Sequence, residues 1–181
     1  MWPGSYITEA LRPGDSILSI CCGIGIELRK LREETPITAV DIIPEYIAEF
    51  RKMFPWAETH VEDAVKFLEE CPDDSYDLVS CIDGIEHLTK KQGQKLLKEC
   101  KRVCRNKVLI FTPEGYIKNE PKKTWGIDGG DHAQLHLSGW EVKDLVDAGY
   151  ELLGQNATLS QHKEAYNESM YVYNKPIQQA V

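Results

Sequence analysis

Residues whose side chains or backbone could bind a ligand follow directly after short apolar runs. Gly23 and Gly25 come after the run 16–20, and Asp41 comes after the run 37–40. A Gly-x-Gly turn before a helix lets backbone N–H groups approach a ligand closely. A carboxylate after the next strand can accept hydrogen bonds from two ribose hydroxyls. Each feature alone also fits an ordinary turn or helix cap, but together they indicate a nucleoside ligand.

Carboxylates and histidines follow the later apolar runs. Asp63 comes after the run 59–61, where it could bind an adenine amino group or cap the next helix. The groups that follow the run 76–82 or end the segment 114–137 are Asp83, Glu86, His87, Asp131, His132 and His136. Such groups can transfer protons in a reaction, and they can equally order the loops that contain them.

The spacing of apolar residues predicts the elements that position these groups. Expected strands cover 16–20, 37–40, 59–61, 76–82 and 108–111, and expected helices cover 25–34, 44–54, 63–70 and 89–104. Such alternation favours a parallel sheet with helices on both faces. A helix from Ser138 to about 148 and two further strands, 150–158 and 168–174, follow. The last two strands are close in sequence, which favours an antiparallel hairpin.

The composition of the chain disfavours several classes of function. The 181 residues carry a formal net charge of −8, which disfavours binding to nucleic acid. An apolar run of about 18 residues, as a membrane-spanning helix requires, is absent. The first residues lack the pattern of a signal peptide, so we expect a cytoplasmic protein. We expect one domain over 1–181, with an N-terminal segment 1–14 and a substrate loop 114–137.

The order of the motifs resembles that of the class I S-adenosylmethionine-dependent methyltransferases. The matching segments are Ile-Leu-Ser-Ile-Cys-Cys-Gly-Ile-Gly at 17–25, Val-Asp at 40–41, Glu-Asp-Ala at 62–64, Tyr-Asp-Leu-Val at 76–79 and Ile-Glu-His-Leu at 85–88. The resemblance covers nearly the whole chain. It implies a Rossmann-like doubly wound α/β sheet, mostly parallel, of seven strands with a C-terminal antiparallel hairpin. It also implies methyl transfer from S-adenosyl-L-methionine as the cofactor.

The resemblance further implies which residues bind this cofactor. They are Cys21, Gly23 and Gly25 at its methionine part, Asp41 at the ribose, Ile42 on the adenine face, Asp63 and Ala64 at the adenine edge, and Cys81 and Asp83 beneath the sulfonium. Two positions depart from the family pattern. Ser19 stands where the family usually has an acidic residue that helps to hold the cofactor's amino group, and Cys21 stands where glycine is usual. Both changes could weaken cofactor binding, so a non-catalytic, cofactor-binding partner subunit is an alternative.

Methyl transfer needs alignment of the acceptor with the sulfonium, and a base only where the acceptor loses a proton. We expect catalytic roles for Asp83, Glu86, His87 and His136, and an oxygen or nitrogen acceptor on a small molecule. In a second alternative, Asp83, Glu86, His87 and His132 bind Mg²⁺ or Mn²⁺, as in a metal-assisted RNA 2′-O-methyltransferase. Because one sheet uses nearly the whole chain, the loop 114–137, the N-terminal segment or another chain must recognise the acceptor. A homodimer or a partner subunit is therefore possible.

Overall fold

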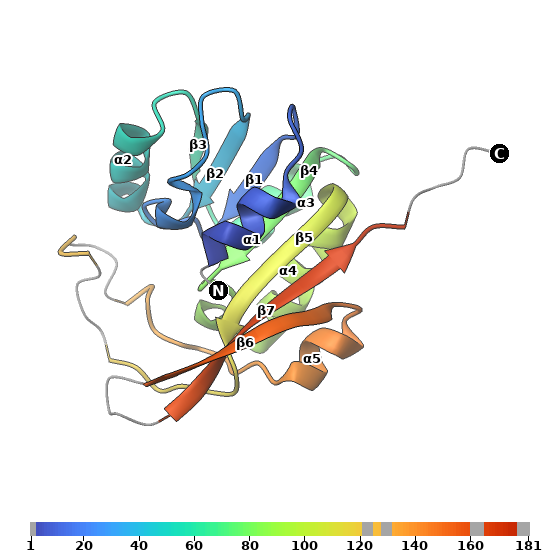
Figure 1. Ribbon diagram of the computed structural model, residues 1–181. Coiled ribbons are helices and arrows are strands. Elements are labelled where there is room, and N and C mark those ends of the chain that lie inside the picture. Colours follow the sequence, from blue (N-terminus) through green and yellow to red (C-terminus); the bar gives the residue numbers. More distant parts are fainter. Residues whose placement is uncertain (1–2, 121–124, 128–131, 160–164, 177–181) are drawn as a thin grey trace.

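A computed structural model describes residues 3–120, 125–127, 132–159 and 165–176 of the protein. Its centre is a seven-stranded sheet of order β3-β2-β1-β4-β5-β7-β6 (Figure 1). The strands are β1 (Ile17–Ile20), β2 (Ile37–Asp41), β3 (Glu58–Val61), β4 (Tyr76–Ile82), β5 (Cys104–Pro113), β6 (Glu151–Leu159) and β7 (Ala165–Asn174). Strands β1 to β5 are parallel, whereas β7 is antiparallel to both β5 and β6. This arrangement confirms the predicted Rossmann-like fold with its C-terminal hairpin.

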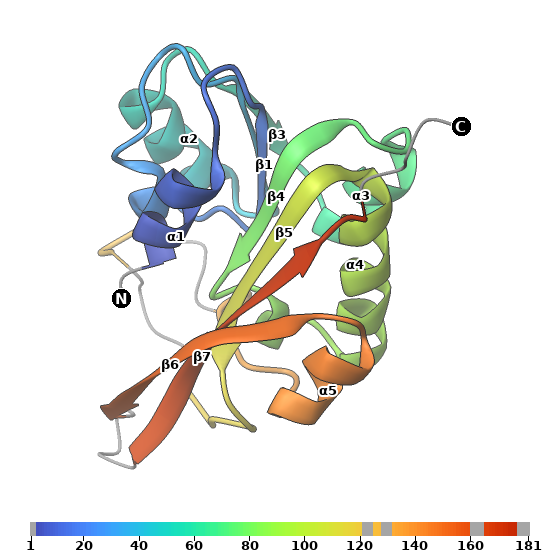
Figure 2. The same cartoon turned by 45° about the vertical axis from the view of Figure 1, so that its right-hand side comes forward.

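The helices lie in two layers, one on each face of the sheet (Figures 1 and 2). One layer contains α1 (Pro3–Ala10), the short 3₁₀ helix η1 (Ile26–Leu28) and α2 (Pro44–Met53); the other contains α3 (Ala64–Glu70), α4 (Lys90–Val103) and α5 (Val142–Asp147). Each layer buries an apolar cluster against the sheet. Every residue of β1 and β2 is buried, as expected for strands that are covered on both faces.

Helices near the first glycine turn differ from the prediction. The expected helix 25–34 is wrong, because only η1 forms there and Leu31 N–H donates to the Leu28 carbonyl in an i→i+3 bond. Such bonds close tighter turns than those of an α-helix. The neighbouring position is taken by α1, which the sequence analysis treated only as an N-terminal segment and which packs against η1 (Figure 1). Ile7 of α1 is fully buried, so this helix belongs to the core.

The last helix also begins later than predicted. Ser138 does not cap it, because Glu141 is the N-cap of α5 and accepts from the backbone of the first turn. The Ser138 hydroxyl instead accepts a hydrogen bond of 2.9 Å from the indole N–H of the buried Trp140. Buried tryptophan N–H groups need such a partner, which explains why Ser138 lies outside the helix.

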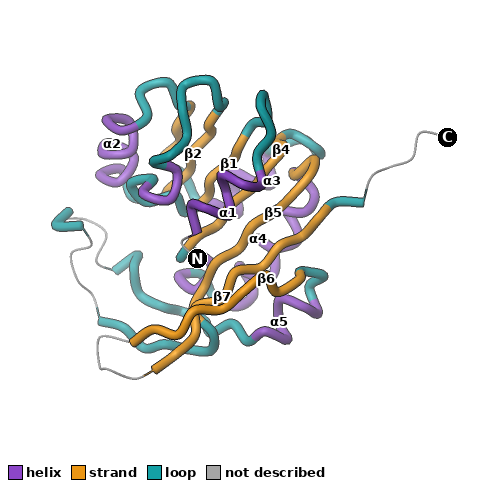
Figure 3. The backbone as a smooth tube through the Cα atoms, viewed as in Figure 1, coloured by secondary structure: helices purple, strands orange, loops and turns teal. Residues whose placement is uncertain are grey.

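The strand order reverses between β1 and β4, where doubly wound sheets usually bind their ligands. The loops that follow the parallel strands meet at one edge of the sheet, and the described parts of 114–137 lie beside this edge (Figure 3). Residues 121–124 and 128–131 of this loop are outside the described part of the chain. Among the described residues, no helix is both long and apolar enough to cross a membrane.

Candidate active site

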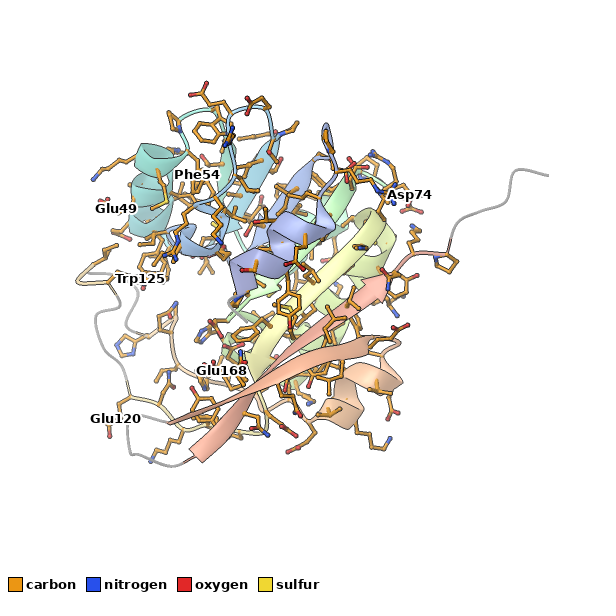
Figure 4. All side chains as sticks on the ribbon, viewed as in Figure 1. Glu49, Phe54, Asp74, Glu120, Trp125 and Glu168 are labelled. Atoms are coloured by element: carbon orange, nitrogen blue, oxygen red, sulfur yellow. The ribbon has the colours of Figure 1, made fainter. Side chains whose placement is uncertain are left out.

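A cavity of about 1150 Å³ opens at the carboxyl ends of the parallel strands. Ligand cavities in proteins usually measure about 300–1,000 Å³, so this one has room for two small molecules. The loops after all five parallel strands line it, and β6 and β7 add Asn156, Tyr166 and Glu168. Glu120 and Trp125 of the loop and Glu168 of β7, labelled in Figure 4, also line it. The site therefore forms where the strand order predicts it.

Asp41 ties the end of β2 to the glycine turn after β1. Its carboxylate accepts hydrogen bonds of 2.8 Å from Gly23 N–H and 2.9 Å from Ile43 N–H. Burial raises the pKa of Asp41, while these two donors lower it. Only 6% of the residue is exposed, and the exposed part lines the cavity. Because each carboxylate oxygen has a further lone pair, Asp41 can still accept from hydroxyl groups in the cavity.

The next loop supplies an apolar surface and a second carboxylate. Ile42 lines the cavity and is 58% exposed, although it is an apolar residue in a well-packed region. Asp63 caps α3, because its Oδ1 accepts from Val65 N–H at 2.9 Å and Lys66 N–H at 3.0 Å. Both roles predicted for Asp63 remain compatible, since the second carboxylate oxygen is not used by the cap. Ala64 also lines the cavity.

Two predicted cofactor residues have no surface in the cavity. Gly25 is not among the lining residues, and a Cβ atom on it would lie 2.6 Å from the Phe50 ring. Cys81 is fully buried within the sheet. Gly25 has a φ of 79°, so its contribution to the site is the left-handed turn before η1.

A carboxylate that the sequence analysis did not consider also lines the cavity. Glu27 follows the glycine turn in η1, and the hydroxyl of the buried Ser19 donates to it at 3.4 Å. The surrounding protein raises the pKa of Glu27 to about 7, because it replaces the water that would stabilise the charge. The signal for this residue was its position two residues after Gly25, which brings it back toward Ser19.

On the other side of the cavity, Glu86 and His87 lie in the 3₁₀ helix η2 (Ile85–His87). Glu86 is 3% exposed, and the Thr112 hydroxyl donates to it at 3.0 Å. Nδ1 of His87 lies 3.3 Å from the Leu135 carbonyl, which can only accept. The proton is therefore assigned to Nδ1, and Nε2 of the neutral ring is free to accept one.

His136 is brought to this cluster by hydrogen bonds of the main chain. The Glu86 carbonyl accepts from Leu137 N–H at 2.8 Å and from Ser138 N–H at 3.1 Å. The Asn119 side chain donates to the Gln134 carbonyl at 2.6 Å and accepts from His136 N–H at 2.8 Å. As a result, the rings of His87 and His136 lie 5.2 Å apart. The end of the loop 114–137 thus contributes directly to the site.

The ionisable groups of this cluster are shifted toward their neutral forms. Burial raises the pKa of Glu86 to about 7 and lowers that of His87. Burial and the neighbouring His87 lower the pKa of His136. Asp83 is exposed toward the cavity but is surrounded by protein atoms, and this loss of water together with the carboxylates of Glu86 and Glu168 raises its pKa well above the usual range.

His132 lies apart from this cluster. It is exposed and does not line the cavity, whereas ligand atoms of Glu86, His87 and His136 lie within 4.8 Å of one another. Among the described residues, His136 therefore lies with Glu86 and His87 of η2, whereas His132 and Asp83 do not belong to this cluster. The metal set predicted from the sequence stays a prediction.

Trp125 covers the glycine turn. A Cβ atom on Gly23 would lie 2.7 Å from the Trp125 ring, which also packs edge-on against Tyr46 at 5.2 Å. Trp125 is 48% exposed and belongs to the expected substrate loop 114–137. In the structure it lies on the same side of the cavity as Asp41 and Ile42, which also line it.

Comparison with known proteins identifies the family. The profile of a family described as "Methyltransferase domain" matches residues 17–107, half of the chain. The chain belongs to the class I S-adenosylmethionine-dependent methyltransferase family. The matched segment contains the glycine turn, Asp41, Asp63 and the Glu86-His87 pair of this methyltransferase. No curated protein matches its sequence.

Solved structures support the same fold. The methyltransferase superposes on the YcgJ protein of Bacillus subtilis with a TM-score of 0.70 at 14% identity, covering 96% of this chain and 97% of the other. It superposes on a Haemonchus contortus phosphoethanolamine N-methyltransferase bound to phosphomonomethylethanolamine and S-adenosylhomocysteine with a TM-score of 0.69 at 15% identity. This match covers 96% of this chain and 52% of the other. With a Haloferax volcanii putative methyltransferase in complex with the Trm112 activator, the TM-score is 0.67 at 15% identity. This match covers 99% of this chain and 91% of the other.

The cavity fits S-adenosylmethionine, the cofactor of this family. Asp41 offers a fixed acceptor for ribose hydroxyls, and the exposed Ile42 offers an apolar surface for a flat base. Gly23 has a φ of 51° and, because it lacks a Cβ atom, allows a close approach, which the Trp125 ring makes in this structure. The residues of the methyltransferase are therefore compatible with its cofactor on the side of β1, β2 and β3.

Proposed function

We propose that the protein transfers a methyl group from S-adenosylmethionine to an oxygen or nitrogen atom of a small molecule. One observation carries the proposal: a single cavity is lined by Asp41 and Ile42 at one end and by Glu86, His87 and His136 at the other. The first group suits a nucleoside and the second suits proton transfer. The two reactants would thus meet in one cavity, where they can be aligned as a displacement reaction requires.

Cofactor binding is assigned to the loops after β1, β2 and β3. Asp41 would hold the ribose, Ile42 and Ala64 would contact the adenine, and Asp63 would accept from its amino group. Cys21 and Gly23 would contact the methionine part through their backbone, with Asp83 near the sulfonium. The cofactor supplies an activated methyl group when bound, so these residues act by orienting it.

Proton removal is assigned to the cluster around η2. Since burial lowers the pKa of His87 and of His136, both rings are largely neutral at pH 7 and can accept a proton. The Leu135 carbonyl fixes the tautomer of His87, which leaves Nε2 as its acceptor atom. Glu86, held by Thr112, would orient the acceptor or stabilise the protonated imidazole.

The charge of this end of the cavity bears on the acceptor. Asp83, Glu86 and Glu168 line it, and none of them belongs to an ion pair among the described residues. Asp83 and Glu86 are shifted toward their neutral forms, so the acceptor is selected by pairing and not by fixed charge. An amine would stabilise the charged carboxylates and a neutral hydroxyl compound can bond to either form, whereas an anionic acceptor would find Lys118 as the one Lys or Arg side chain among the described lining residues. We therefore propose a neutral or cationic acceptor, with the loop 114–137 as its recognition segment within a single domain, 1–181.

Turnover can be tested without knowledge of the acceptor. The protein is incubated with S-adenosylmethionine and a panel of amines, phenols, alcohols and carboxylates, and S-adenosylhomocysteine is quantified by mass spectrometry. We expect turnover with a neutral or amine acceptor and a loss of about 10²- to 10⁴-fold in kcat for the double variant His87→Ala/His136→Ala. The matched control is His60→Ala, since His60 pairs with Glu58 on the edge strand β3 and does not line the cavity.

Two results would change this assignment. Binding of S-adenosylhomocysteine without turnover across the panel would favour the alternative of a non-catalytic partner subunit. The complex of the Haloferax volcanii protein with its activator makes a partner chain a concrete possibility to test. Turnover with carboxylate acceptors only would contradict the proposed charge selection.

A metal-assisted reaction is the second candidate, favoured by the proximity of ligand atoms from Glu86, His87 and His136. Carboxylate oxygen and imidazole nitrogen are both ligands of divalent metals. A metal at this cluster would make turnover sensitive to a chelator and recoverable with Mn²⁺. Turnover that is unchanged after chelation and dialysis would remove this candidate.

A further inference from the structure

Glu27 lies where the glycine turn returns toward the centre of the sheet. It is the second residue of η1, and its Oε1 accepts from the hydroxyl of Ser19, a 2% exposed residue of β1. Part of the Glu27 side chain remains exposed in the cavity, beside the turn that contains Cys21 and Gly23. Its carboxylate is therefore available to a ligand that enters along this turn.

Among the residues that the structure describes, those around Glu27 include acidic groups, and no basic side chain forms an ion pair with it. Asp41 at the end of β2 and Asp83 after β4 are the charged groups that raise its pKa, and the buried Cys22 thiol also faces it. A carboxylate in such a place is stable as an anion only when a cation joins it.

The other carboxylates that line the cavity hold backbone groups or belong to other segments, and Glu120 and Glu168 lie in the loop after β5 and in β7. Asp41 uses both oxygens to hold Gly23 and Ile43, and Asp63 caps α3 on the adenine side. Asp83 and Glu86 lie after β4, on the acceptor side. Apart from Asp41, whose two oxygens are already bound to the backbone, Glu27 is the carboxylate beside the turn that the methionine part of the cofactor would follow, and that part carries an ammonium group.

We propose that Glu27 binds the ammonium group of S-adenosylmethionine and takes over the role of the acidic residue that this family usually has at position 19. The inference rests on the proposed cofactor site. Ser19 then acts as a positioning residue, because its short side chain leaves room for the Glu27 carboxylate and donates a hydrogen bond to it. The departure at position 19 would move the carboxylate from β1 to η1 without removing it.

The first test compares two ligands. S-adenosylhomocysteine carries the ammonium group, and its deamino analogue lacks it. By calorimetry, we expect the wild-type protein to bind S-adenosylhomocysteine on the order of 10- to 100-fold more tightly than the analogue, the usual range for a charge-assisted hydrogen bond. Glu27→Gln should lose most of this preference. The exposed Glu33→Gln is the matched control and should keep it.

A second test moves the carboxylate from position 27 to position 19, and it separates the role of the charge from that of its position. In the double variant Ser19→Asp/Glu27→Gln, the acidic group returns to β1, so the preference for S-adenosylhomocysteine should recover at least in part. Circular dichroism and thermal unfolding establish that each variant is folded. An equal preference in wild type and Glu27→Gln would overturn the role of Glu27.

Proton release on the wild-type protein tests the same role without a substitution. The ammonium group should lower the pKa of Glu27 from about 7, so binding at pH 7 should release a fraction of a proton. Calorimetry in phosphate and Tris buffers measures this release, which the deamino analogue should not cause. Equal release with both ligands would contradict the inference. Failure of the wild type to bind either ligand would instead overturn the proposed cofactor site itself.

Discussion

Gly84 leaves room for the side chain of Cys21, since a Cβ atom on Gly84 would lie 2.6 Å from the Cys21 Cβ. Cys21 has a φ of 51°, in the left-handed region that glycine adopts without strain. A residue with a side chain costs about 1–2 kcal/mol in this region. The cysteine at this family glycine position is therefore matched by a glycine in the loop after the neighbouring strand, β4.

Gly84→Ala should destabilise the protein because the new methyl group would meet two side chains. Besides Cys21, the Cys81 sulfur would lie 2.9 Å away. We expect a loss of about 1–3 kcal/mol in the free energy of unfolding, measured in urea. In a Cys21→Gly background the loss should be smaller, although the contact with Cys81 remains. Equal losses in the two backgrounds would show that Cys21 and Gly84 are not coupled.

Trp125 should report cofactor binding, because its ring covers Gly23 at the place where the methionine part would approach. Addition of S-adenosylhomocysteine should change the tryptophan fluorescence of the wild type. Trp125→Phe should lose most of this change. Trp56→Phe should retain it, since Trp56 packs against Phe54 outside the cavity. A full fluorescence change in Trp125→Phe would mean that binding of S-adenosylhomocysteine does not alter the surroundings of Trp125.

The contribution of Glu86 to the stability of the ligand-free protein should fall as the pH rises from about 4.5 to about 7. The pKa of Glu86 is raised from 4.5 to about 7, so the folded protein binds more protons than the unfolded chain in this window. Its stabilising contribution is complete below the unfolded pKa and is lost as the pH rises through the folded value, on the order of 3 kcal/mol in all.

Glu86→Gln should flatten this dependence, because the neutral amide can still accept from Thr112. Glu27, Asp41 and Asp83 act in the same direction and His87 and His136 in the opposite one, so the slope should change further, without vanishing, in the double variant with Glu27→Gln. The measurement is urea unfolding at several pH values. An identical slope in wild type and double variant would show that neither carboxylate is shifted as described.

The sheet could be predicted because each strand carries its own local pattern. The runs 16–20, 37–40 and 76–82 are mainly apolar, and the structure places them side by side as β1, β2 and β4. The helix at Pro3–Ala10 was missed because Ile7 becomes buried only against the sheet. The expected helix 25–34 failed because α1 packs there against η1, a competition that no local pattern shows.

The residues of the candidate site were likewise predicted only in part. Gly23, Asp41, Asp63 and Glu86 follow strands, so the fold itself brings them to one edge. The meeting of His87 with His136 depends on two hydrogen bonds to the Glu86 carbonyl from a segment 51 and 52 positions later, which no spacing reveals. Glu27 was missed because its importance depends on Ser19, a neighbour in space. The cytoplasmic location and the choice between a homodimer and a partner subunit stay predictions.

Calorimetry with S-adenosylhomocysteine on the wild type and on Asp41→Ala tests the central claim most directly. The wild type should bind one equivalent, and Asp41→Ala should bind about 1–3 kcal/mol more weakly, the usual cost of unpaired buried polar groups. Ser16→Ala, which removes a hydrogen bond to Asp77 outside the cavity, controls for a loss of stability alone and should bind normally. Unchanged affinity in Asp41→Ala, or no binding to the wild type, would contradict the account.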